Sequence, residues 1–106
     1  MTERSLIWMP RALADRRAIW DRIGPDDPGA AARLDEEIVA KAERLLRFPQ
    51  LGRPGRIEGT QELVVRPNYL LVYRVEGTEV WILTVWHAAR DWPPADLESE
   101  EPDDKD

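Results

Sequence analysis

The feature that most constrains the fold is the turn Gly24-Pro25-Asp26-Asp27-Pro28, which separates two segments with helical periodicity. In the first segment, residues 11–23, apolar residues recur at spacings of three, four and seven, which predicts an amphipathic helix. Its predicted apolar side is Ala12, Leu13, Ile19, Trp20 and Ile23, and its predicted polar side is Asp15, Arg16, Arg17, Asp21 and Arg22.

A second helix begins at the end of this turn. Aspartate followed by proline is typical of a helix start, because the carboxylate caps free N–H groups and proline lacks one. The predicted helix runs to about Arg47, where Phe48-Pro49 stops it. Its apolar stripe is Ala31, Leu34, Ile38, Ala42 and Leu45. The sequence therefore predicts a helical hairpin whose combined apolar side needs a partner.

Three β-rich runs in the second half of the chain provide that partner. They cover residues 62–66, 69–75 and 79–86, are separated by turn signals, and predict an antiparallel meander. A shorter apolar run, residues 5–9, is closed by Pro10 and predicts an edge strand or an extended lead-in.

Strand alternation makes both faces of the predicted sheet apolar at the centre. In the middle run, one face carries Tyr69, Leu71, Tyr73 and Val75, and the other carries Leu70, Val72 and Arg74. In the last run, Trp81, Leu83, Val85 and His87 alternate with Val80, Ile82, Thr84 and Trp86. We expect one face to lie beneath the helices and the other to be half covered or reserved for a partner.

The charge of the chain is unevenly distributed. The net charge is -6, and residues 96–106 hold seven of the 21 acids but one of the 15 bases, which leaves 14 of each in residues 1–95. We expect one domain, residues 1–95, followed by an acidic, disordered tail, residues 96–106. Within residues 44–74, six arginines outnumber Glu58 and Glu62, a local basic surface suited to an acidic partner.

The composition also narrows the chemistry. The chain has no cysteine and one histidine, His87, so we expect no disulfide, no metal site and no cofactor. The N-terminal apolar run is too short for a signal peptide or a membrane span, which predicts a cytoplasmic protein that does not engage a membrane.

Four short motifs, in their order and spacing, resemble the RelE/ParE superfamily of type II toxin–antitoxin toxins over about residues 5–93. They are Phe48-Pro49-Gln50-Leu51-Gly52-Arg53-Pro54-Gly55-Arg56, Gly59-Thr60-Gln61-Glu62-Leu63, Tyr69-Leu70-Leu71-Val72-Tyr73-Arg74-Val75 and His87-Ala88-Ala89-Arg90-Asp91-Trp92-Pro93. The resemblance implies an α/β (α+β) fold, in which an N-terminal strand and a two-helix hairpin precede three strands, in the order β-α-α-β-β-β, and the hairpin packs on a twisted antiparallel β-sheet.

The superfamily contains two classes of activity. RelE-like members are ribosome-dependent endoribonucleases, whereas ParE-like members bind DNA gyrase and block it without being enzymes. Neutral or acidic residues begin two strands, at Gln61-Glu62 and Asn68-Tyr69, where the ribonucleases prefer arginine. Together with His87-x-x-Arg90, this departure favours the ParE side.

The resemblance therefore implies a non-covalent gyrase inhibitor that a cognate antitoxin neutralises and that does not bind DNA directly by itself. Two alternatives stay open. One is a ribonuclease that acts on ribosome-bound mRNA, and the other is a non-toxic homologue kept for antitoxin binding.

The candidate target-binding residues are Arg53, Arg56, Tyr69, His87, Arg90 and Trp92, whereas the ribonuclease alternative uses Arg53, Arg56, Glu62, His87 and Arg90 for catalysis. Structural interpretations compete with these roles. Glu62 would pair with an arginine and fix the loop, and His87 would end a strand and hold the following segment by hydrogen bonds. We assign Tyr73 to the core, leave Tyr69 open between core and surface, and expect at least one of Trp81, Trp86 and Trp92 in the core.

Overall fold

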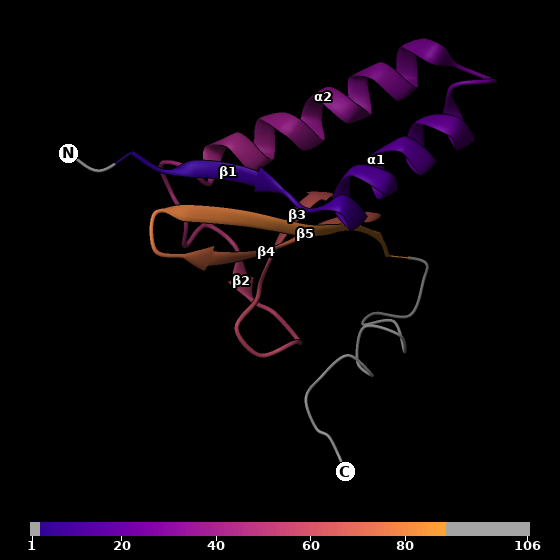
Figure 1. The fold of residues 1–106 in the computed structure, drawn as a ribbon. Coiled ribbons are helices and arrows are strands. Elements are labelled where there is room, and N and C mark those ends of the chain that lie inside the picture. Colours follow the sequence, from indigo (N-terminus) through magenta and orange to yellow (C-terminus); the bar gives the residue numbers. More distant parts are fainter. Residues whose placement is uncertain (1–2, 89–106) are drawn as a thin grey trace.

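The computed structural model describes residues 3–88, which form two helices on one side of a five-stranded sheet (Figure 1). The elements are β1 (Ser5–Trp8), α1 (Pro10–Ile23), α2 (Pro28–Arg44), β2 (Arg53–Pro54), β3 (Gln61–Arg66), β4 (Tyr69–Glu76) and β5 (Glu79–His87). Across the sheet the order is β1-β5-β4-β3-β2. Neither helix in this part of the chain is long and apolar enough to cross a membrane.

The helix boundaries follow the turn chemistry of the sequence. Pro10 and Pro28 occupy first helical positions, and the Asp27 carboxylate accepts a hydrogen bond from the N–H of Ala30 at 3.0 Å. Helix α2 ends at Arg44, three residues before the predicted end. The next three residues continue as tighter turns, in which each N–H donates to the carbonyl three residues earlier.

The buried side of α1 differs from the predicted one. Ala12 and Ile19 are buried, but Leu13 and Trp20 are 49% and 37% exposed. The helix turns Asp15 toward the sheet instead, and its carboxylate accepts hydrogen bonds from the backbone N–H of Val85 and the hydroxyl of Thr84. The hydrophobic pattern alone misplaced this side, because a polar group satisfied by hydrogen bonds can lie against a sheet.

The structure confirms the predicted antiparallel meander, which consists of β3, β4 and β5. One further strand lies at each edge of the sheet. Strand β1 confirms the predicted edge strand and pairs in parallel with β5, from Ser5 opposite Glu79 to Trp8 opposite Ile82. The short strand β2 pairs antiparallel with β3 at the other edge. The sheet therefore contains both parallel and antiparallel pairs. The elements follow the predicted order β-α-α-β-β-β, with the short strand β2 as an additional element before β3.

A bulge in β5 corrects the predicted alternation of its side chains. Val72 pairs with Thr84 but the next residue, Tyr73, pairs with Ile82, so Leu83 has no partner in β4. After the bulge, Val85 packs in the core beneath the helices, while Leu83 and Trp86 lie with the opposite cluster. A uniform period of two cannot describe a strand that contains an extra residue.

One apolar cluster lies on each face of the sheet. The main core lies between the helices and the sheet and includes Leu34, Ile38, Leu71, Tyr73 and Ile82. We call the sheet face opposite the helices the far face; its smaller cluster consists of Leu70, Val72 and Trp86, with Ile57 and Leu83 packed against it. Both faces of the sheet are thus apolar at the centre, as predicted.

Candidate functional site

The segment that carries two of the candidate arginines, residues 52–60, is held against the sheet by close backbone contacts; we call it the arginine loop. The hydroxyl of Tyr73 donates to the carbonyl of Pro49 at 2.7 Å and accepts from the N–H of Gly52 at 2.9 Å. A side chain at Gly52 would lie 2.7 Å from the carbonyl oxygen of Glu62, so only glycine allows this approach. The start of the arginine loop is therefore fixed by the core.

The second half of the arginine loop is held by hydrogen bonds between its own residues. The N–H of Gly55 donates to the carbonyl of Thr60 at 2.8 Å, and the Thr60 hydroxyl donates to the carbonyl of Ile57 at 2.6 Å. Gly59 has a φ of 85°, a left-handed conformation that glycine adopts without strain. These bonds set the direction in which Arg53 and Arg56 leave the backbone.

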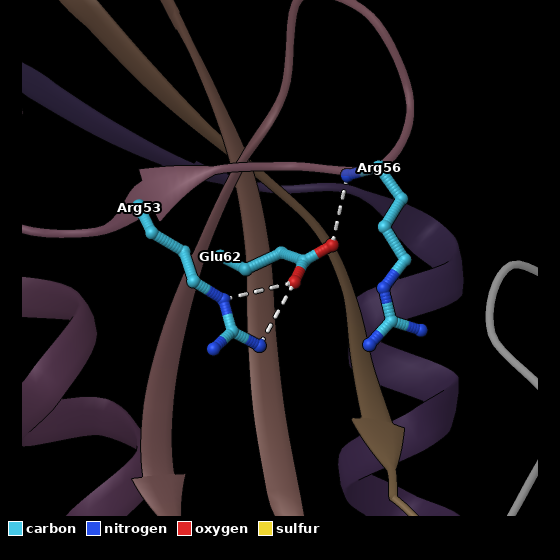
Figure 2. A network of polar contacts seen from close by, with 3 residues as sticks. All are labelled: Arg53, Arg56 and Glu62. Carbon is cyan, nitrogen blue, oxygen red and sulfur yellow. Dashed lines mark hydrogen bonds and ion pairs between the residues drawn. The ribbon is translucent and has the colours of Figure 1, made fainter.

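A buried carboxylate joins the two arginines (Figure 2). Glu62 lies on β3 with a side chain that is 2% exposed. One of its oxygens accepts from Arg53 Nε at 3.4 Å and Nη2 at 3.2 Å, and the other accepts from the backbone N–H of Arg56 at 3.1 Å. The structure confirms that Glu62 pairs with an arginine and fixes the loop.

Both arginines of the loop lie at the surface of the protein. The Arg53 side chain is 55% exposed although it bonds to Glu62, and Arg56 is also exposed. Guanidinium groups in this position can bind carboxylates or phosphates through paired hydrogen bonds. Arg53 lies opposite Glu62 in the sheet, and Glu62 lies opposite Val72. Because Val72 belongs to the cluster of the far face, the contacts of Glu62 with the arginine loop lie on that face as well.

His87 lies on the other face of the sheet. It ends β5 opposite Tyr69, and the two rings meet edge to face with centroids 4.9 Å apart. Tyr69 and His87 line a small cleft against α1, together with Asp15, Ala18, Ile19, Arg22 and Val85. The sheet therefore separates His87 from Glu62, and these two candidate catalytic groups do not converge.

The tyrosines are both buried. Tyr73 is fully buried, which confirms its assignment to the core, and burial raises its pKa above the usual value. Tyr69 is 4% exposed, and its hydroxyl accepts a hydrogen bond of 2.8 Å from Arg22 Nη2. This burial decides the open question for Tyr69 in favour of the core and leaves little of its side chain for a target.

The sequence of residues 6–92 matches the family described as the ParE toxin of the type II toxin-antitoxin system parDE. This chain belongs to the ParE toxin family. It is 42% identical over 94 residues, 88% of this chain and 97% of the relative, to Y4kP of Sinorhizobium fredii, which is named as a toxin. It is 40% identical over 85 residues, 80% of this chain and 96% of the relative, to Toxin RelE2 of Caulobacter vibrioides.

Solved structures agree with the ParE assignment. A chain of the chromosomal ParDE system from P. aeruginosa superposes with a TM-score of 0.72 at 28% identity, covering 80% of this chain and 96% of that one. A chain of the toxin-antitoxin complex RelBE2 from Mycobacterium tuberculosis gives 0.61 at 27% identity, covering 81% and 99%. The α+β fold that the sequence resemblance implied is thus the fold of the ParE and RelE toxins.

Some predicted features of this ParE family member are outside the described residues. They are the site residues Arg90 and Trp92 and the acidic segment 96–106. Within residues 3–88, no three His, Asp or Glu side chains group as metal ligands. Trp86 is 5% exposed, which confirms that at least one of the three tryptophans belongs to the core.

Sequence reasoning missed two residues of α1 that contact the last strand. Asp15 accepts a hydrogen bond from the N–H of Val85, next to the bulge of β5, and the guanidinium of Arg11 lies 5.7 Å from the centroid of the Trp86 ring on the far face. Helical periodicity placed Asp15 on the polar side of the helix and gave no assignment for Arg11. Neither contact has a sequence signal, because each joins residues about 70 positions apart.

Proposed function

We propose that this chain is a ParE-like toxin that inhibits DNA gyrase by non-covalent binding and is neutralised by a cognate antitoxin. The observation that carries the non-covalent mechanism is the separation of His87 from Glu62 by the sheet. Cleavage of RNA through its 2′-hydroxyl needs a proton acceptor and a proton donor on either side of one phosphate. Glu62 and His87, the acid–base pair named for the ribonuclease alternative, do not face one position together.

The state of Glu62 supports the same mechanism. Its carboxylate is buried and accepts three hydrogen bonds from the arginine loop, so it is occupied in structure rather than directed at a substrate. A general base must reach the proton that it removes. The described groups are better suited to binding a macromolecular surface than to acid–base catalysis.

The binding surface in this proposal combines the meander with the segment that follows β5. Arg53 and Arg56 provide exposed groups on the far face, and His87, on the other face, is proposed as a contact together with Arg90 and Trp92. Arginine and tryptophan are enriched among the residues that dominate binding energies at protein interfaces. The sequence also predicted Tyr69 as a target-binding residue. In this proposal it supports the binding surface by packing in the core.

The antitoxin partner follows from the family. The similar solved structures include a ParDE system and the RelBE2 toxin-antitoxin complex. A protein partner could cover the apolar surface that the monomer leaves exposed, such as Leu13, Trp20 and Phe48. Co-expression with the product of a neighbouring small reading frame should then restore growth of bacteria that make this chain.

Two assays on the purified full chain test the target. We expect it to inhibit supercoiling by gyrase and to leave ribosome-bound mRNA intact. Cleavage of the message with normal supercoiling would transfer the function to the ribonuclease alternative, which the similarity to Toxin RelE2 favours. If unpartnered expression is harmless, the non-toxic alternative stands instead.

Two variants test the site. Arg90→Ala and His87→Ala should each lower inhibition of gyrase by about tenfold or more, as expected when an interface loses a major contact. Arg33→Ala, which removes an exposed arginine from α2, is the matched control and should inhibit as the unmodified chain does. Equal inhibition by all three variants would contradict the placement of the site.

A further inference from the structure

Apolar side chains gather at the surface where α2 ends. An open hollow of about 480 Å³ lies there and is lined by Arg44, Phe48, Pro49, Gln50 and Leu51, which we call the α2-end surface. The Phe48 and Leu51 side chains are 51% and 40% exposed, so much of their apolar area stays outside the core. Single exposed apolar residues are ordinary, whereas several around one hollow are typical of an interaction site.

The backbone beneath the α2-end surface is held by hydrogen bonds. The N–H of Phe48 donates to the carbonyl of Arg44 at 2.9 Å, and the N–H of Leu51 donates to the carbonyl of Phe48 at 3.0 Å. The carbonyl of Pro49 accepts from the hydroxyl of Tyr73, a fully buried residue, at 2.7 Å. The fold therefore directs two large apolar side chains toward solvent, where they are available for burial against a partner.

Three arginines surround the same end of α2, and all three are exposed. Arg44 lines the hollow, and the guanidinium of Arg47 lies 5.9 Å from the centroid of the Phe48 ring. Arg4, at the start of β1, donates to the carbonyl of Leu46 at 3.1 Å (Figure 1). Among residues 3–88, none of these three arginines forms an ion pair. Their charges remain available to a carboxylate from outside the domain.

The acids nearest to these arginines lie outside the hollow. Glu3 and Glu43 are exposed, and neither lines it. Glu43 precedes Arg44 on α2, and consecutive helical residues point about 100° apart around the axis. The hollow therefore combines an apolar floor with positive charge at its rim. Such a surface is complementary to a peptide that carries acids beside an apolar anchor.

The shape of the hollow favours a peptide over other ligands. Its volume lies within the range of about 300–1,000 Å³ that ligand pockets have, so it is large enough for an apolar side chain of a partner. Because it is open to solvent, a small molecule would stay largely exposed there, whereas a peptide gains further contacts on both sides of its anchor. Binding of single-stranded nucleic acid uses several aromatic platforms, and Phe48 is the one aromatic residue in the lining.

We propose that the α2-end surface binds an acidic segment of the antitoxin. An apolar side chain of the segment occupies the hollow beside Phe48 and Leu51, and its carboxylates lie at Arg4, Arg44 and Arg47. The source of the segment rests on the antitoxin partner proposed above, whereas the chemistry of the surface does not. No residue of this surface belongs to the candidate target-binding set, so antitoxin contact here is separate from the proposed contact with gyrase.

NMR titration of the full chain with short synthetic peptides tests the chemistry of the surface. One peptide carries a leucine–tryptophan centre between glutamates, and two others carry glutamines or lysines in place of the glutamates. We expect the acidic peptide to shift the amide resonances of Phe48 and Leu51, and the lysine peptide to bind at least about tenfold more weakly. The affinity of the acidic peptide should fall in 1 M salt, where the Debye length is ~3 Å.

Variants of the chain identify the two parts of the contact. Arg44→Gln combined with Arg47→Gln should lower the affinity for the acidic peptide about fivefold or more and bring it close to that for the glutamine peptide. Phe48→Ser should lower the affinity for all three peptides, because it removes apolar contact and leaves the charges in place. The amide spectrum of each variant shows at the same time that it is folded.

Matched controls remove similar groups from elsewhere on the surface. Arg17→Gln combined with Arg33→Gln removes the same charge from exposed helix positions. Val64→Ser removes an apolar side chain that is 42% exposed on β3. Both should bind the acidic peptide as the unmodified chain does.

The antitoxin itself tests the source of the segment. In a complex with the antitoxin encoded by the neighbouring reading frame, the amides of Phe48 and Leu51 should exchange hydrogen more slowly than in the free chain. The Arg44→Gln and Arg47→Gln pair and Phe48→Ser should each weaken the complex about tenfold or more, as expected for major contacts of an interface. The control variants should bind the antitoxin as the unmodified chain does.

Five results would overturn the proposal. They are no shift at Phe48 and Leu51 with the acidic peptide, equal binding of the three peptides, an antitoxin complex that the variants do not weaken, larger shifts with a single-stranded RNA than with the acidic peptide, and shifts that follow the concentration of the chain alone. The last two would assign the surface to nucleic acid or to a second copy. Gyrase inhibition enters none of these measurements, so its absence would contradict the proposed function and leave this test intact.

Discussion

Glu62 shows how one buried side chain organises a functional loop. Its carboxylate is 2% exposed and accepts hydrogen bonds from a side chain and from the backbone of the arginine loop. Burial of a charge is costly unless such bonds compensate for the lost hydration. Glu62 therefore positions Arg53 and Arg56 instead of presenting itself at the surface.

Removal of this carboxylate should destabilise the domain. Glu62→Ala removes the buried carboxylate that accepts from the backbone N–H of Arg56 and from the Arg53 side chain, and we expect the free energy of unfolding to fall by about 1–3 kcal/mol. Glu62→Gln keeps an oxygen acceptor and should cost less. Urea denaturation measures both, with the exposed Glu58→Gln as a control expected within ~0.5 kcal/mol of the unmodified chain. A tolerated alanine would show that the loop is held by its other bonds.

Tyr73 gives the loop a second anchor and predicts a pH effect. Burial raises the pKa of its hydroxyl, so the folded chain holds this proton more tightly than the unfolded chain does. The stabilisation is complete below the unfolded pKa of about 10 and is lost as pH rises through the folded pKa. The free energy of unfolding should therefore decline above pH 10.

Tyr73→Phe isolates this effect. The variant loses the bonds to Pro49 and Gly52, and we expect it to be about 1–2 kcal/mol less stable at pH 8. The difference from the unmodified chain should then shrink above pH 10, in urea denaturation at each pH. A difference that stays constant with pH would contradict a raised pKa.

At the scale of elements, α1 is joined to the sheet through the bulge of β5. Asp15 accepts from the N–H of Val85 at 3.0 Å and from the hydroxyl of Thr84, in a region where the extra residue disrupts the β4 ladder. Bulges leave backbone groups without a partner in the neighbouring strand. The carboxylate of Asp15 supplies that partner, which makes helix and bulge one structural unit.

This unit predicts a graded response at Asp15. Asp15→Ala should cost about 1–3 kcal/mol, because the buried N–H of Val85 loses its acceptor, whereas Asp15→Asn keeps one and should cost less. Hydrogen exchange of the Val85 amide should accelerate in the alanine variant. Asp21→Ala, at a position 69% exposed on the same helix, is the control and should leave that amide unchanged. Unaltered exchange in Asp15→Ala would show that the bulge is held without α1.

Two ion pairs connect further elements. Arg16 binds Asp35 through Nε and Nη2 at 2.9 and 2.8 Å and joins the two helices, while its guanidinium lies 4.6 Å from the Trp8 ring centroid. Arg66 binds Glu37 in the same bidentate manner and joins β3 to α2, which lowers the pKa of Glu37. Bidentate geometry fixes orientation more than it adds stability at exposed positions.

At the scale of the whole molecule, the net charge is concentrated in one segment of the sequence. Residues 96–106 supply the entire net charge of -6, while residues 1–95 are balanced. Substituting the seven acids of this segment by their amides should shift the isoelectric point upward from about 4.8.

The same variant should fold as the unmodified chain does. Because we predict that this segment lies outside the domain, removal of its charge should change the free energy of unfolding by about 1 kcal/mol or less, and the melting temperature should move by only a few degrees. Calorimetry of the two full chains measures the shift. A much larger loss would contradict the predicted boundary between the domain, residues 1–95, and the acidic segment.

The fold was largely predictable because its signals are local. Proline and aspartate at Asp27-Pro28, the stripe of α2 and the turns of the meander each act within a few residues, and each is present in the structure. Tyr73 was assignable to the core because it alternates with Leu71 on one face of a strand. The ion pair between Glu62 and an arginine could be predicted because a carboxylate near two guanidinium groups seldom stays unpaired.

The arrangement of the site was decided by the tertiary structure. The sequence determined the elements, their order and the family, since hydrophobic period, capping and turn chemistry are properties of neighbouring residues. It did not determine that His87 and Glu62 lie on opposite faces, that β1 joins β5 in parallel, or that Asp15 turns inward. Those outcomes depend on register, on a single bulge and on contacts between distant residues, which exist only once the chain has folded.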